Sequence, residues 1–150
     1  MKKDDFNAII DFAVDREKEA VEFYQYLQTK SKFAEIKEML KDLEEMEKGH
    51  IGTLEKVREK GIKEVKVNKV NDLHIADYMA DIEPSPEMDY QNILIVAMKR
   101  EEKSKELYED LAVRFAGTDI EKLLLKIASD ESGHKLKFEI LYDEHVLKEN

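Results

Sequence analysis

The sequence predicts an all-α protein, a four-helix bundle, and three observations support this prediction. Gly (5) and Pro (2) are scarce among 150 residues, while 40% of the residues are charged and 42% are hydrophobic. This composition is typical of long amphipathic helices. Apolar residues recur at steps of three and four along four segments, which is the period of a left-handed bundle. The two halves of the chain also align with each other, and the length fits one domain over residues 1–150.

Charge and cysteine content exclude several classes of function. The formal net charge of −10 argues against a general nucleic-acid or anionic-membrane surface. Cysteine is absent, which excludes disulfides, thiol catalysis, cysteine-ligated zinc and iron–sulfur clusters. No segment approaches the roughly 18 apolar residues of a membrane span, and no apolar run follows the charged N-terminus. We therefore expect a cytoplasmic protein that has no nucleic-acid or membrane partner.

Two helix pairs are expected, at 4–60 and 85–148. Within the first pair the only plausible break lies near Ser31, and Gly61 is expected to end the second helix as a C′ glycine. The intervening crossover, 61–84, is expected to begin as an extended segment and to carry a short extra helix. A connection of this length can run along a whole bundle, so the pairs need not follow a simple up-down-up-down order.

The second helix pair has its own start and break signals. Ser85 followed by Pro86 is typical of an N-cap and the first helical position. The break is expected at Gly117, after which Thr118 and Glu121 have the spacing of a capping box. The two pairs are therefore each expected to form a helical hairpin.

Each of the four predicted helices has an apolar seam that polar residues interrupt in its middle. A seam of this kind normally faces the core of a bundle, where polar side chains are unusual. The interruptions therefore indicate a function at the centre of the bundle. They are Glu17 in the first seam, Glu47 and His50 in the second, Glu101 in the third, and Glu131 and His134 in the fourth.

The same polar residues coincide when the chain is aligned with itself. An offset of 84 residues aligns the two helix pairs without a gap, and 14 of the 66 overlapping residues are identical. This is about three times the number expected from composition. Chance similarity between two charged amphipathic hairpins is the alternative, because glutamate is abundant. The identities include the six polar seam residues and two further pairs, Tyr24 with Tyr108 and Gly49 with Gly133.

The six polar seam residues predict a pair of bound metal ions. An unpaired buried carboxylate costs several kcal/mol, and four of them together would repel one another. No Lys or Arg lies at the middle of a seam, whereas two divalent cations would neutralise the four glutamates. Glu and His three residues apart lie on one helical face, so each Glu-x-x-His can bind one ion. Oxygen and nitrogen ligands without thiolate suit iron or manganese, and zinc is also possible.

The order of these motifs resembles that of the rubrerythrin-related branch of the ferritin-like superfamily. The resemblance covers nearly the whole chain and rests on two Glu-x-x-His motifs, each beginning 30 residues after a central Glu. It implies a ferritin-like four-helix bundle that binds two iron ions, and an oxidoreductase that reduces peroxide or dioxygen. The implied ligands are Glu17 and His50 for one ion, Glu101 and His134 for the other, and Glu47 and Glu131 as bridges.

Two departures separate the chain from typical rubrerythrins. The family often carries a rubredoxin-type iron site held by cysteines, which this chain lacks, so electrons are expected from an external donor protein. Ser104 lies one turn after Glu101, where the family usually has an additional carboxylate. The simpler set of four Glu and two His then remains. The resemblance also implies a homodimer.

Two other functions fit the same six residues. The first is iron binding with ferroxidase-type storage or detoxification and no fast turnover. The second is a structural or interaction module in which buried polar residues only fix the register of the helices. Six convergent ligands are more than register requires, so metal binding is the favoured interpretation.

Several further residues carry expectations of their own. Tyr24 and Tyr108 are candidates to bond ligand carboxylates, with core packing as the alternative. A glycine inside a helix costs about 1 kcal/mol relative to Ala. Gly49 and Gly133 therefore suggest space near the metals, a close helix contact or a π-bulge.

The remaining histidines and the charged runs are expected to be peripheral. His74 and His145 are interpreted as surface or seam-end residues rather than ligands. Runs such as Glu44 and Glu45 are expected to form solvated helix faces.

Overall fold

The structure is a computed structural model that describes residues 3–30, 34–64, 75–78 and 89–145. The chain divides into two compact units, 1–71 and 72–150. Within the described ranges there are helices and no strands, so the predicted all-α, ferritin-like fold class is confirmed. None of the described helices combines the length and apolar character that crossing a bilayer requires. The helices are α1 (Lys3–Lys30), α2 (Ala34–Glu64), the 3-10 helix η1 (Ile75–Tyr78), α3 (Tyr90–Val113) and α4 (Asp119–His145).

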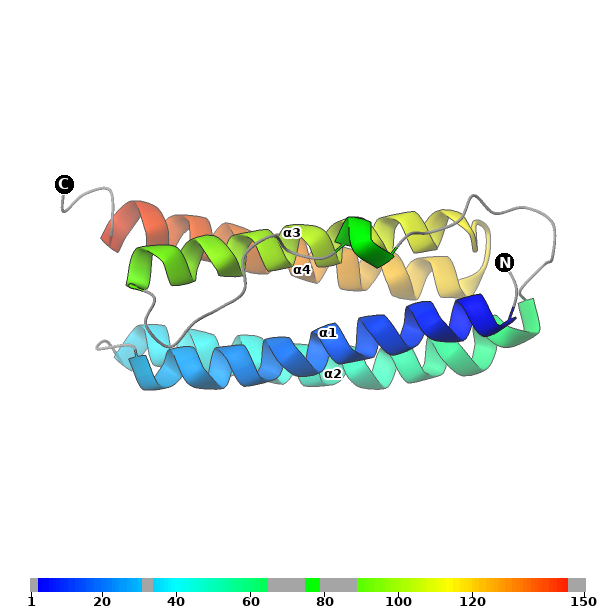
Figure 1. Cartoon of the computed structure of the whole chain (residues 1–150), viewed down its shortest axis with the longest axis horizontal. Helices are drawn as coiled ribbons and strands as arrows, with labels where there is room; N and C mark the ends of the chain where they lie inside the picture. The colour runs from blue at the N-terminus through cyan, green and yellow to red at the C-terminus, as the bar shows by residue number, and fades with distance from the viewer. Residues whose placement is uncertain (1–2, 31–33, 65–74, 79–88, 146–150) are drawn as a thin grey trace. The chain divides into compact units, whose positions relative to one another are not determined.

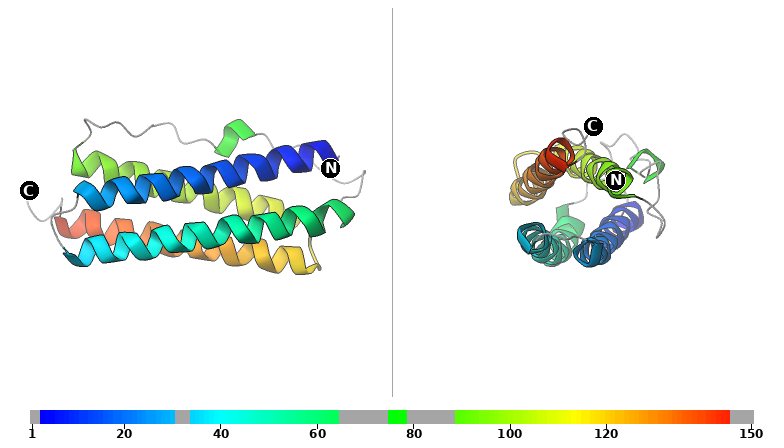
Figure 2. Two further views of the ribbon diagram at one scale, coloured as in Figure 1. Left: turned by 90° about the horizontal axis from the view of Figure 1, so that it is seen from below. Right: turned by 90° about the vertical axis from the view of Figure 1, so that its left-hand side faces the viewer.

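The first unit is an antiparallel hairpin of α1 and α2 (Figure 1 and Figure 2). Its seam side chains are buried, as the helical period predicts, and the chain reverses between Lys30 and Ala34 as expected. Arg58 near the end of α2 donates to Asp11 of α1 at 2.6 Å and to Asn7 at 3.3 Å. These two contacts fix the register of the open end of the hairpin.

Gly61 does not end α2, so its predicted role as a C′ glycine is wrong. The helix continues to Glu64. A Cβ atom at position 61 would overlap the ring of Phe6, with the two Cε atoms at 2.8 and 3.0 Å and Cζ nearer still. The glycine therefore allows the Phe6 ring to pack against the backbone of α2.

The second unit is an antiparallel hairpin of α3 and α4 (Figure 1 and Figure 2). Asp89 is the N-cap of α3, and its side chain accepts a hydrogen bond from the Asn92 amide at 2.8 Å. The prediction that Ser85 caps this helix is therefore wrong. Ser85 and Pro86 themselves lie outside the described residues. The cap moved because Asp89 offers a stronger acceptor than a serine hydroxyl to the first-turn amides.

The predicted break between α3 and α4 is confirmed. Gly117 has a φ of +84°, a left-handed conformation that glycine adopts without strain. The hydroxyl of Thr118 accepts from the Glu121 amide at 3.4 Å, which is one half of the predicted capping box.

The described part of the crossover, η1, packs against α3 (Figure 1). The hydroxyl of Tyr78 donates to Asp110 of α3 at 2.7 Å, and Tyr78 is buried. Desolvation, followed by the Asp110 contact, raises the pKa of Tyr78 above its usual range. The rest of the predicted crossover lies outside the described residues.

The two hairpins repeat one another in their contacts as well as in their sequence. Arg58 donates to Asn7 at 3.3 Å, and Gln91 donates to the Tyr142 hydroxyl at 3.1 Å. These pairs occupy the same positions after a shift of 84 residues, although all four residue types differ. The offset therefore describes a repeated hairpin structure, which chance similarity of composition does not explain.

Candidate metal centre

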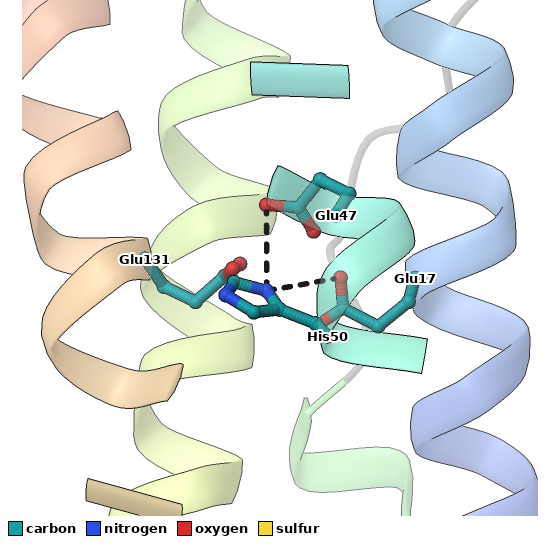
Figure 3. Close-up of side chains that lie close together, drawn as sticks. All are labelled: Glu17, Glu47, His50 and Glu131. Atoms are coloured by element: carbon teal, nitrogen blue, oxygen red, sulfur yellow. Dashed lines mark ion pairs between the residues drawn. The ribbon is translucent and has the colours of Figure 1, made fainter. Parts of the chain in front are cut away.

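The first hairpin brings Glu17, Glu47 and His50 together at its middle, and we call them the first half-site. Glu17 comes from α1 and the other two from α2 (Figure 3). The three residues are 1%, 0% and 5% exposed. His50 Nδ1 lies 3.6 Å from a Glu17 oxygen and 3.8 Å from a Glu47 oxygen. Each residue offers one potential ligand atom, and these atoms lie within 4.8 Å of one another.

The second hairpin contains an equivalent second half-site of Glu101, Glu131 and His134. Glu101 comes from α3 and the other two from α4, and each is 2% exposed. His134 Nδ1 lies 3.6 Å from a Glu101 oxygen and 3.8 Å from a Glu131 oxygen. The three potential ligand atoms also lie within 4.8 Å of one another.

Helix geometry explains why both half-sites form in the same way. In each hairpin the Glu and His of the Glu-x-x-His motif lie one turn apart on a single helical face. The remaining Glu lies at the middle of the opposite helix, on its buried seam. Matching distances in two hairpins show that the repeated spacing produces a repeated three-residue cluster.

The electrostatics of the first half-site oppose keeping its carboxylates ionised without a cation. Burial, followed by the charge of Glu47, raises the pKa of Glu17 to about 8. His50 partly offsets this shift by favouring the ionised carboxylate. A proton therefore occupies Glu17 at neutral pH unless another cation replaces it.

The donor set of each half-site fits a transition-metal ion. The His–Glu separations of 3.6 and 3.8 Å are longer than ordinary hydrogen bonds. Ligands held at about 2.0–2.2 Å from one ion lie roughly 3–4 Å from each other. Two carboxylates and one imidazole without sulfur suit iron, manganese or zinc.

Tyr24 and Tyr108 are buried one helix turn or more from the half-sites, in the seams of α1 and α3. They are 2% and 0% exposed, so the core-packing part of the expectation is confirmed. Their proposed bonds to ligand carboxylates stay a prediction. Ser104, one turn after Glu101, is half-buried on α3.

The repeated glycines next to the histidines are not needed for packing within their hairpins. Gly49 and Gly133 are exposed and lie in regular α-helix, so neither marks a π-bulge. A Cβ at either position would meet no atom within 4 Å among the described residues. The expectation of a close helix contact or of reserved space near the metals is therefore wrong for both hairpins. His74 and the side chain of His145 lie outside the described residues.

Glu44 is a buried polar residue that the sequence analysis assigned to a solvated face. It lies one turn before Glu47, is 8% exposed, and accepts bonds from Gln25 at 3.2 Å and Gln28 at 2.8 Å of α1. Lys48 forms an ion pair with it at 2.8 Å. These contacts lower the pKa of Glu44 and hold α1 and α2 in register beside the first half-site. Two glutamines one turn apart on α1 are the only sequence signal for this contact.

The fold and the two clusters define a helical protein with buried carboxylate and imidazole groups suited to metal binding. Residues 8–142 match the family model described as Rubrerythrin. The chain therefore belongs to the rubrerythrin family of the ferritin-like di-iron superfamily, as the motifs predicted. The comparison with curated proteins and the comparison with solved structures gave no match.

Proposed function

We propose that this protein is a di-iron oxidoreductase that reduces peroxide or dioxygen with electrons from an external donor protein. The observation that carries the proposal is the pair of buried half-sites with the same donor set and the same His–Glu distances. Membership of the rubrerythrin family supports iron as the metal.

In this proposal the two half-sites face each other and share two ions. Glu17 and His50 hold one ion, while Glu101 and His134 hold the other. Glu47 and Glu131 bridge the two ions, because each belongs to a Glu-x-x-His motif and lies at the middle of its helix. Two ferrous ions, when bound, would supply the two electrons that cleavage of an O–O bond requires.

The protein residues bind the ions, exclude water and control protons. The near-complete burial of all six side chains removes competing solvent ligands and strengthens their electrostatic interactions. Glu17 carries a proton at neutral pH when no cation is bound, so metal binding displaces that proton. Reduction of one peroxide to two waters consumes two electrons and two protons, and the donor and solvent must replenish both.

The electron donor is proposed to be a separate protein. The 150 residues contain no cysteine, so they hold no rubredoxin-type iron site that could relay electrons. A redox protein that docks transiently would complete the cycle.

Iron storage or detoxification is the second candidate function, because the same ligands would oxidise ferrous iron without a donor. The two candidates differ in the number of turnovers that each iron pair supports. Repeated turnover requires a donor, whereas storage ends in retained ferric iron.

The decisive experiment combines metal analysis with anaerobic turnover. Protein loaded with ferrous iron should contain close to two ions per chain. Peroxide should then be consumed repeatedly while a chemical or protein reductant is supplied. A single oxidation followed by retained ferric iron would favour storage, and protein that binds no metal would refute both candidates.

A further inference from the structure

An exposed apolar line runs along α4 on the face opposite its buried seam. Leu125, Leu136 and Ile140 are 46%, 55% and 47% exposed. With Ser129 they recur at helical spacing, so they lie on one face of the helix. An amphipathic helix normally carries charged residues there. We define the α4 line as Lys122, Leu125, Ser129, Ser132, Gly133, Leu136, Ile140 and Asp143.

The repeated hairpin provides an internal comparison for this surface. The buried seams of α2 and α4 match at the half-site positions, but their outer faces differ. The apolar residues of the α4 line are therefore neither required by the hairpin fold nor a remnant of the repeat. The α2 residues that correspond to Leu125, Ser129, Leu136 and Ile140 are Lys41, Glu45, Gly52 and Lys56.

The α4 line is symmetric about the junction between Ser132 and Gly133. Two small residues lie at the centre, where they permit two helix backbones to approach closely. Apolar side chains follow on both sides, and opposite charges lie at the two ends. An antiparallel second copy of α4 would therefore pair residues equally far from the centre. These pairs are Ser129 with Leu136, Leu125 with Ile140, and Lys122 with Asp143.

We propose that the α4 line is a homodimer interface in which two copies of α4 pack antiparallel across a two-fold axis. Such an axis brings the same surface of both copies together, which this self-complementary order permits. Antiparallel packing places Lys122 beside Asp143 of the other copy, whereas parallel packing would place like charges together. This interface is independent of metal binding and extends beyond the proposed function.

The expected association is reversible, since two single helices bury less than the roughly 1,600 Å² of a standard interface. Sedimentation equilibrium of the full chain over a range of concentrations should show a monomer–dimer equilibrium. Leu136→Lys should weaken dimerisation at least about tenfold, because it places a charge at the interface. Val113→Lys is the matched control, since Val113 is 72% exposed on α3 outside the α4 line. A wild-type monomer at every concentration, or unchanged dimerisation of Leu136→Lys, would overturn the proposal.

Two further variants test the antiparallel orientation. Lys122→Asp should weaken the dimer, and adding Asp143→Lys to it should restore dimerisation. Because the chain has no cysteine, a single introduced thiol reports its own neighbours. Ser132→Cys should form a disulfide-linked dimer, whereas Asp143→Cys should not, because its two copies lie about 30 Å apart along the helices. Crosslinking of Asp143→Cys without Ser132→Cys would rule out this packing.

Discussion

Glu17 shows how strongly one buried side chain depends on its surroundings. The carboxyl group is 1% exposed and lies near Glu47 and His50. In water it would be ionised at neutral pH, but burial raises its pKa to about 8. A group of this kind either holds a proton or binds a cation, which is why we interpret it as a ligand.

Stability of the metal-free protein should fall as pH rises from about 4.5 to about 8. Between these values the folded state keeps the Glu17 proton that the unfolded state has lost. Folding is then coupled to proton uptake, so the free energy of unfolding decreases with pH. Urea unfolding of metal-free protein at several pH values would measure the slope. Glu17→Gln should flatten it, and an unchanged slope in this variant would show that other groups dominate.

Glu47→Ala should abolish binding of the paired ions. The change removes a proposed ligand from the first half-site and, in the proposed centre, a bridge between the ions. The expected result is a loss of close to two ions per chain in metal analysis. The control is Glu45→Ala, whose side chain is 62% exposed on the same helix. Wild-type stoichiometry in Glu47→Ala would mean that the ligand assignment is wrong.

At the scale of the elements, α2 shows how a contact between helices changes the meaning of a residue. Gly61 resembles a helix terminator locally, yet the helix continues because Phe6 of α1 occupies the space where a Cβ would lie. Glu44 resembles a surface charge, yet Gln25 and Gln28 of α1 bury it. Both residues serve the α1–α2 interface that positions the first half-site.

Two glycine-to-alanine substitutions in α2 should have opposite effects on stability. Gly61→Ala should destabilise the protein by about 1–3 kcal/mol, since the new methyl group overlaps Phe6. Gly52→Ala should stabilise it by up to about 1 kcal/mol, because nothing within 4 Å opposes the gain in helix propensity. Thermal or urea unfolding of both variants would measure the difference. Stabilisation by Gly61→Ala would show that the Phe6 contact relaxes at no cost.

At the scale of the whole molecule, a repeated hairpin supplies two equivalent halves of a candidate centre. The half-sites have equal donor sets and equal distances, and they occur in two separate compact units. Three ligands from one hairpin leave an ion partly open, so a paired centre requires both hairpins. The proposed function therefore depends on how the units associate.

Spin coupling between two bound ferric ions should report whether the half-sites meet. If they share bridging carboxylates, the paired ions should show little electron paramagnetic resonance signal at low temperature. His50→Ala should disturb the coupling and reveal the signal of an unpaired ferric ion. Two full-intensity uncoupled signals in the wild-type protein would show that each hairpin binds its ion separately.

The sequence by itself determined the helical class, the seams and the six residues of the half-sites. These features follow from local periodicity and from the repeat, which need only positions along one helix. Only the tertiary structure decided where α2 ends, how Gly61 is used and why Glu44 is buried. Each of these depends on a partner residue in another helix. Local sequence signals carry no information about such a partner, and packing against it outweighs them.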